Sequence, residues 1–146
     1  MATNHTYIAA PPERVWQVLA DPLSYGHWVV GSSRTRQLKG RWPNKGAIFS
    51  HTQGIGPIGL ADTTEVIDSR RPNRLVLELR VRPFIVGRVE LRLEPHREGT
   101  WVSMIERVFG GLVGSIAGLL GEPLILVRNV ESLRRLRRMA EKGETR

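Results

Sequence analysis

Two ionisable side chains on expected strand faces are the best candidates for chemistry in this sequence. His51 shares a strand face with Phe49 and Gln53. If that face points inward, the imidazole can act as a general base or as a hydrogen-bond anchor near neutral pH. Glu106 shares a face with Met104, and a carboxyl there can serve as an acid or pair with an inward base. If these faces point outward, His51 is a solvent-exposed or structurally bonded residue and Glu106 is an ordinary surface carboxylate.

The other residues that could carry chemistry do not form a known motif. The remaining histidines, at positions 5, 27 and 96, lack metal-ligand spacing with nearby carboxylates, and the chain has no cysteine. A serine-nucleophile elbow, a paired-histidine zinc motif and a P-loop are all absent from the sequence. We therefore expect no metal and no cofactor.

One segment, Gly54 to Gly59, literally matches the glycine pattern of dinucleotide-binding loops. That site needs a helix after the glycines, whose N-terminus holds the pyrophosphate. Here the sequence LADTTEVID follows, which predicts a strand, and Pro57 lacks a backbone donor. The pattern indicates a glycine-rich hairpin loop at the mouth of a pocket.

The elements that must position these residues are an antiparallel sheet and one long helix. Four segments follow one another along the chain: a strand over 1–9, two short helices over 11–28, strands and turns over 32–108, and an amphipathic helix over 123–141. Asp21 is a suitable N-cap for the second short helix. This order predicts an α+β fold in which about seven antiparallel strands curl around the C-terminal helix and leave a cavity between sheet and helix.

The closing helix can be phased at about 100° per residue. Its inner side is predicted to carry Leu126, Asn129, Val130, Leu133, Leu136 and Ala140, and its outer side Arg128, Glu131, Arg134, Arg135 and Arg138. Arg137 also points inward, near the helix end where its stem can reach past the sheet edge. The candidate ligand-binding residues are Trp28, Phe49, Met104, Leu126, Asn129 and Leu133.

Three stretches of the chain resemble one superfamily. They are IAAPPERVWQVLADPLSYGHW near the start, TTEVIDSRRPNRLVLELRV in the middle, and LRLEPHREGTWVSMIERV before the closing helix. Together they resemble the START-like, helix-grip (SRPBCC) superfamily, most closely its polyketide cyclase/dehydrase-like branch. The resemblance implies a single ligand-binding domain over 1–146 with an apolar cavity and no shared catalytic signature. Members include ring cyclases, dehydrases, lipid carriers and hormone binders, so the fold alone does not set the function.

Charge and hydropathy limit which partners, nucleic acid or membrane, the chain is expected to bind. The net charge is +8, and residues 128–146 carry seven basic and three acidic side chains. We interpret this basic stretch as a solvated helix face with no specific nucleic-acid partner; a nucleic-acid or anionic-lipid site is the alternative. Residues 108–127 are apolar but contain five glycines, Glu122 and Pro123, so we expect no stable membrane insertion. This segment is either a flexible cover over one end of the pocket or an ordinary packed connection.

The N-terminus has no signal-peptide pattern, and the absence of cysteine suits a reducing compartment, so we expect a cytoplasmic protein. The sequence leaves a homodimer open. The leading functional hypothesis is binding of a small hydrophobic or aromatic molecule, polyketide-like or lipid-like, in the cavity. One alternative is a cofactor-independent cyclase or dehydratase that uses His51 and Glu106 as an acid/base pair. The other is a lipid-transfer or membrane-peripheral module.

Overall fold

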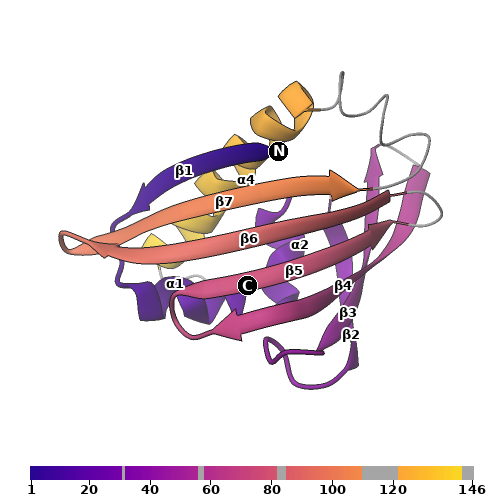
Figure 1. The fold of residues 1–146 in the computed structure, drawn as a ribbon, viewed down its shortest axis with the longest axis horizontal. Coiled ribbons are helices and arrows are strands. Elements are labelled where there is room, and N and C mark those ends of the chain that lie inside the picture. The colour runs from indigo at the N-terminus through magenta and orange to yellow at the C-terminus, as the bar shows by residue number, and fades with distance from the viewer. Residues whose placement is uncertain (31, 56–57, 82–84, 110–121, 143–146) are drawn as a thin grey trace.

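The computed structural model describes residues 1–30, 32–55, 58–81, 85–109 and 122–142 (Figure 1). Its elements run in the order β1 (Ala2–Ile8), α1 (Pro12–Leu19), the 3-10 turn η1 (Pro22–Ser24), α2 (Tyr25–Trp28), β2 (Ser32–Lys39), β3 (Ile48–Ile55), β4 (Ile58–Arg70), β5 (Arg74–Val81), β6 (Ile85–His96), β7 (Gly99–Phe109) and α4 (Glu122–Lys142). The predicted N-cap forms, because Asp21 Oδ1 accepts a hydrogen bond of 3.0 Å from the backbone N–H of Leu23.

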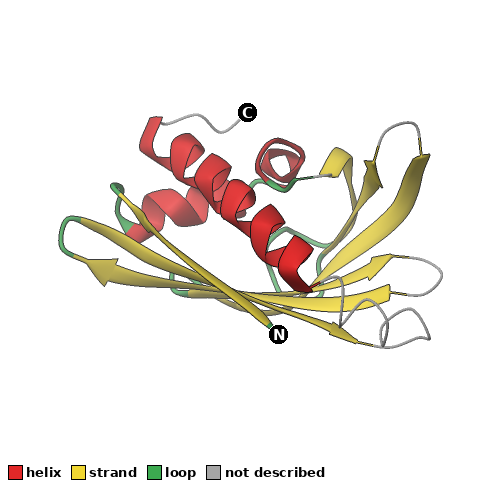
Figure 2. Cartoon of the chain, turned by 90° about the horizontal axis from the view of Figure 1, so that it is seen from above, coloured by secondary structure: helices red, strands yellow, loops and turns green. Residues whose placement is uncertain are grey.

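Seven strands form one antiparallel sheet in the order β1-β7-β6-β5-β4-β3-β2. The first strand thus lies beside the last, with Asn4 opposite Met104. The sheet bends around α4, which crosses its concave side together with α1 and α2 (Figure 2). The predicted α+β helix-grip fold is confirmed. A strand follows the glycine pattern, since Gly54 pairs with Gly59 between β3 and β4. The dinucleotide interpretation is therefore excluded by the local fold.

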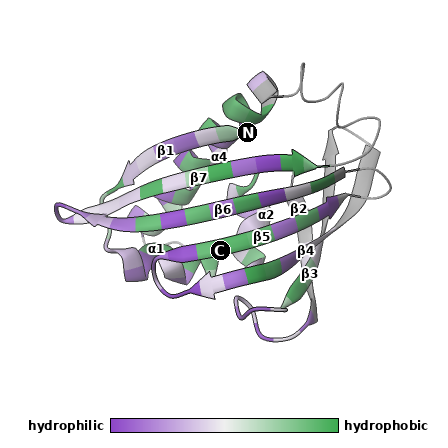
Figure 3. Ribbon diagram, viewed as in Figure 1, coloured by the Kyte–Doolittle hydropathy of each residue, from purple (hydrophilic) through white to green (hydrophobic). Residues whose placement is uncertain are grey.

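Alternation along the central strands supplies the apolar inner face. On β5, Leu75 and Leu77 are buried whereas Arg74 and Arg80 are more exposed. Hydrophobic and hydrophilic residues alternate along the ribbons of the central strands (Figure 3). The register between β4 and β5 shifts after Val66, which marks a β-bulge. A bulge adds local twist and bends its strand. The long central strands can therefore curl while their leucines keep facing α4.

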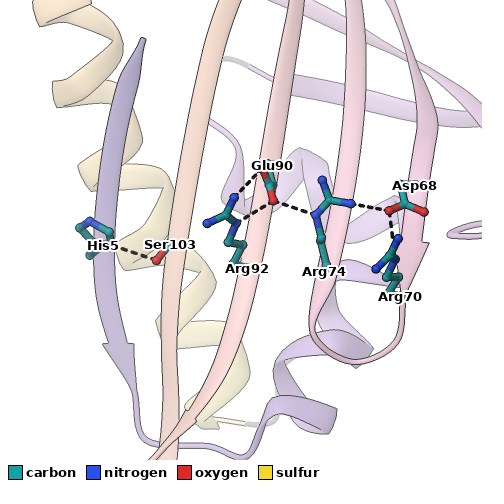
Figure 4. Close-up of polar contacts among 7 residues, drawn as sticks. All are labelled: His5, Asp68, Arg70, Arg74, Glu90, Arg92 and Ser103. Atoms are coloured by element: carbon teal, nitrogen blue, oxygen red, sulfur yellow. Dashed lines mark hydrogen bonds and ion pairs between the residues drawn. The ribbon is translucent and has the colours of Figure 1, made fainter.

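A row of ion pairs crosses the outer face of the sheet (Figure 4). The Glu90 carboxylate accepts from Arg92 Nε at 2.7 Å and from Arg74 Nε at 2.8 Å. Arg74 also contacts Asp68, which lies 3.4 Å from Arg70 Nε. The hydrogen bond from Arg92 lowers the pKa of Glu90; partial burial opposes this effect, and Arg74 adds to it. The row joins β4, β5 and β6 on the side away from the helices.

Helix α4 is tied to the N-terminal part of the chain at both ends. Asn4 Nδ2 donates to the backbone oxygen of Leu126 at 3.1 Å. Near the C-terminal end, Arg14 donates to the backbone oxygens of Met139 and Ala140, both at 3.2 Å. Carbonyls in the last turn of a helix have no partner within the helix, so Arg14 satisfies groups that would otherwise need water.

The predicted phase of α4 was partly wrong. Val130 was expected inside but is 60% exposed, and Arg137 lies outside, where its Nε is 3.3 Å from a carboxylate oxygen of Glu141. Ser132 and Met139 are buried instead. The buried face is thus rotated from the one that the apolar residues define. It also includes Ser132, whose hydroxyl oxygen accepts from the backbone N–H of Val30 at 3.1 Å.

Gly99 begins β7 at a point where no side chain fits. A Cβ built there would lie 2.3 Å from the backbone oxygen of Ile8 and 2.5 Å from the Tyr7 hydroxyl oxygen. We expect Gly99→Ala to lower the free energy of unfolding by about 1–3 kcal/mol, the range for overpacking a fitted site. Urea unfolding followed by circular dichroism measures this. In the control Gly87→Ala, the added Cβ would meet only Arg107 O at 3.6 Å. Equal losses in both variants would contradict the steric explanation.

The outer ion pairs predict a pH dependence of stability. Because the folded-state pKa of Glu90 lies below its ordinary value of 4.5, its ionised form stabilises the fold above that value. This contribution is lost as the pH falls through the lower folded-state pKa. We expect Glu90→Gln to reduce stability at pH 7 and to flatten the decline in urea midpoint between about pH 5 and pH 3. Glu98→Gln, in the exposed turn before β7, is the control; the same flattening there would contradict this assignment.

Candidate functional site

A small cavity lies between the concave side of the sheet and the helices. Its volume is about 30 Å³, on the order of the space that two water molecules need. Its lining comes from five strands, from α2 with the residue that follows it, and from α4. The lining residues are Tyr25, Trp28, Val29, Phe49, Thr64, Leu77, Leu79, Val89, Leu91, Met104, Glu106 and Arg128. The walls are mostly apolar, and the charged groups come from β7 and α4.

Glu106 lies on the inner face of β7, one of the two orientations that the sequence left open, and its side chain is 7% exposed. Arg128 Nη2 donates to both carboxylate oxygens, at 2.7 and 2.9 Å. Asn129 Nδ2 donates to the second oxygen at 2.8 Å. A carboxylate removed from water needs such donors, because an unpaired buried charge is strongly unfavourable. Three hydrogen bonds from two successive residues of α4 therefore fix Glu106 and join β7 to the helix.

No contact between Glu106 and His51 is seen among the described side chains, which do not include that of His51. His51 lies in β3 opposite Asp62, and its side chain is outside the described part of the structure. Three strands separate β3 from β7, about 19 Å across a flat sheet at ~4.8 Å per step. The curl shortens that span, since Phe49 of β3 and Met104 of β7 line one cavity. The partners that Glu106 does have are Arg128 and Asn129.

An aromatic cluster forms one wall of the cavity. Tyr25 lies 5.0 Å from Trp28 and 5.1 Å from Phe49 between ring centroids, and Trp42 packs edge-on against Phe49 at 4.3 Å. Such offset and edge contacts suit the charge distribution of aromatic rings. Two polar atoms of the cluster share one acceptor. Tyr25 Oη donates to Leu19 O at 2.7 Å, and Trp42 Nε1 donates to it at 2.9 Å.

The phenol of Tyr25 is unsuited to proton transfer. Complete burial raises its pKa well above the ordinary value, and the nearby Trp42 N–H opposes this only in part. The hydroxyl stays neutral across the range in which proteins work, and its proton is directed to Leu19 O. Tyr25 therefore has a structural role: it lines the cavity, and its hydrogen bond to Leu19 O holds α1 in place.

Trp28 differs from its aromatic neighbours. It is 1% exposed, and its indole Nε1–H has no hydrogen-bond partner among the described residues. Arg128 Nε, at the charged end of the cavity, is likewise buried and without a partner. Leaving a buried donor unpaired costs about 1–3 kcal/mol. Both residues line the same cavity, so two of the side chains that form it carry an unpaired donor.

The structure places the predicted site residues as follows. Trp28, Phe49, Met104 and Glu106 line the cavity. Asn129 does not line it but donates a hydrogen bond to Glu106. Leu126 is half-buried, and Leu133 belongs to the core. Sequence reasoning missed Arg128, which was assigned to the outer face of the helix, as well as Tyr25 and Thr64. The signal for Arg128 was Glu106 itself, because a carboxyl on an apolar face predicts a cation on the element that covers it.

The fold agrees with comparisons to known proteins. The family model described as polyketide cyclase / dehydrase and lipid transport matches residues 2–141, so the chain belongs to that family. A search of curated proteins found no match.

Several solved structures share the fold. An aromatase/cyclase from a Streptomyces species superposes with a TM-score of 0.75 at 18% identity, covering 97% of this chain and 93% of that one. A Mesorhizobium loti protein gives a TM-score of 0.73 at 18% identity, covering 97% and 96%. A Thermus thermophilus protein gives 0.72 at 16% identity, covering 97% of each chain. At these identities the likeness concerns the fold.

Two further findings concern the described residues only. None of their helices has the length and apolar character needed to cross a bilayer. No three histidine, aspartate or glutamate side chains among them gather as metal ligands would.

The buried ion pair predicts unequal effects of its two residues on stability. Arg128→Met leaves Glu106 buried with only Asn129 as a donor, so we expect a loss of about 3 kcal/mol. Glu106→Gln leaves an Arg128 side chain that is 33% exposed and can reach water, so we expect a loss of about 1 kcal/mol. Urea unfolding at pH 7 measures both.

The double variant completes the test. Removing both charges should cost less than the sum of the single losses, because neither partner is then left unpaired. Arg135→Met removes an arginine that pairs with Glu131 on the more exposed side of α4, and it should cost less than about 1 kcal/mol. Additive losses, or a larger loss for Glu106→Gln than for Arg128→Met, would contradict the buried-pair account.

Proposed function

We propose that this protein binds a small hydrophobic or aromatic molecule between the sheet and α4. The observation that carries the proposal is the cavity itself: an apolar chamber with an aromatic wall and polar groups gathered around Glu106 and Arg128. Cavities of this composition bury the body of a ligand and orient it by a few polar contacts. The family description, which joins polyketide cyclases and dehydrases with lipid transport, supports the same class of ligand.

The size of the cavity sets a condition on binding. About 30 Å³ holds no organic ring system, so a ligand must displace lining side chains. Leu79 is only partly buried although it lines the cavity, which makes it a side chain that can yield at low cost. The ligand would then complete the core, and its binding energy would be offset in part by the opening of the cavity.

The proposal predicts that ligands stabilise the fold. Aromatic polyketides, sterols and fatty acids should be screened by thermal shift. A ligand present at 100 times its dissociation constant adds about 2.7 kcal/mol to the free energy of unfolding. Leu79→Trp should fill the cavity and abolish the shift. Ile105→Trp, on the outer face of β7, should preserve it. A shift that survives Leu79→Trp would place the ligand elsewhere, and no shift with any compound would contradict the proposal.

A second candidate is a cyclase or dehydratase that uses the same cavity. The observation in its favour is that a carboxylate and a guanidinium lie together at the edge of an apolar chamber. There they could polarise a carbonyl or move a proton once a substrate displaces one of the hydrogen bonds. His51 would be the second member of the acid/base pair.

Turnover separates the two candidates. If the protein is an enzyme, Glu106→Gln and His51→Gln should each lower the rate of ring closure or dehydration about 10²–10⁴-fold and leave affinity nearly unchanged. Product formation from a linear polycarbonyl substrate, followed by absorbance and mass spectrometry, measures this. Binding without conversion by the wild type would exclude the enzyme and leave the binding proposal in place.

A further inference from the structure

We propose that Trp28 is a specificity-determining residue, and that its indole N–H selects neutral ligands whose apolar body carries a carbonyl or similar acceptor oxygen. This inference rests on the proposed function and assigns a chemical class to the ligand. Its starting point is a contrast within the aromatic cluster. The polar atoms of Tyr25 and Trp42 both bond to Leu19 O, whereas Trp28 Nε1 has no partner among the described residues.

The unpaired groups at the cavity are donors. Within the part of the chain that the structure describes, Trp28 Nε1 and Arg128 Nε are both buried and lack partners, and both belong to lining residues. The Glu106 oxygens, by contrast, already accept three hydrogen bonds. Unpaired acceptors occur on Asn4 and Asn129, but neither residue lines the cavity. A molecule that displaces lining side chains could satisfy these unpaired N–H groups, and an acceptor oxygen is the group that complements them.

The charges favour a neutral acceptor over an anion. Arg128 is the one cation among the lining residues of this cavity, and its charge is already matched by Glu106 at 2.7 Å. A ligand carboxylate would bring a second negative charge beside Glu106 with no cation to balance it. Like charges in a shielded site repel, and each would have to be removed from water. Ketones, esters and amides fit the site, whereas fatty-acid carboxylates do not.

Three probes of similar shape test this inference. They are 2-acetylnaphthalene, which has a neutral carbonyl, 2-ethylnaphthalene, which lacks the oxygen, and 2-naphthoate, which is an anion. We expect the ketone to bind wild-type protein about 3–10-fold more tightly than the hydrocarbon, the gain from one net hydrogen bond. The naphthoate should bind no better than the hydrocarbon. Calorimetric titration at fixed pH and salt measures all three.

Variants of Trp28 show whether its N–H causes the preference. Trp28→Phe keeps an aromatic ring and removes the donor. Replacing Trp28 by 3-benzothienylalanine keeps the size and shape of the indole and exchanges N–H for sulfur. Both should bind ketone and hydrocarbon equally. Trp101→Phe makes the same change at a tryptophan that is 38% exposed and stacks on His5, away from the cavity lining, and it should retain the wild-type preference.

A spectroscopic readout separates recognition from packing. The indole N–H signal of Trp28, assigned by its loss in Trp28→Phe, should shift with 2-acetylnaphthalene and much less with 2-ethylnaphthalene. Equal binding of all three probes to wild type would support the proposed function but overturn this inference. A ketone preference that persists in both Trp28 variants would also overturn it. Failure of every probe to bind would contradict the inference together with its premise.

Discussion

The contact between Glu106 and α4 is the interaction on which the interior of this protein depends. A carboxylate cannot remain buried on an apolar sheet face without donors. Arg128 and Asn129 supply three hydrogen bonds from successive positions of the helix. The pair fixes which face of α4 meets β7 at the cavity. It also gives that cavity its only charged region among the residues that line it.

The curl of the sheet brings β7 close enough to α4 for the contact of Glu106 with Arg128 and Asn129. Strands β3 and β7 are separated by three others, yet Phe49 and Met104 line one chamber because the sheet wraps around the helices. The bulge after Val66 helps the sheet to bend. Gly99 lets β1 lie close against the start of β7, where no side chain would fit. The outer face carries charged rows such as that of Glu90. The helix therefore has one apolar face of the sheet to cover.

Much of this fold could be predicted from residue patterns. Strict alternation predicted β5, and the proline and capping signals predicted the short N-terminal helices. The phase of α4 could not be predicted in full, because Ser132 is buried through a hydrogen bond to Val30 that depends on the tertiary fold. Hydropathy placed Val130 inside and Arg128 outside. The structure exposes the valine and half-buries the arginine beside Glu106. Patterns detect burial of apolar surface and overlook polar groups that are buried in pairs.

The candidate site follows the same division. Phe49, Met104 and Glu106 could be selected from their expected strand faces, and Trp28 was among the candidate ligand-binding residues. The pairing state of their polar atoms depends on packing, and no sequence pattern reports it. In the protein the phenol of Tyr25 donates to Leu19 O, whereas the indole N–H of Trp28 has no acceptor among the described residues. An unpaired buried donor weakens the fold, and natural proteins tend to keep such groups where function needs them. In the role proposed for Trp28, a ligand that brings an acceptor oxygen to this N–H would remove that cost. The same unpaired N–H of Trp28 then lowers the stability of the free protein and, as proposed, recognises the ligand. The ligand that best fills the core would therefore also be the one whose oxygen best pairs with this donor.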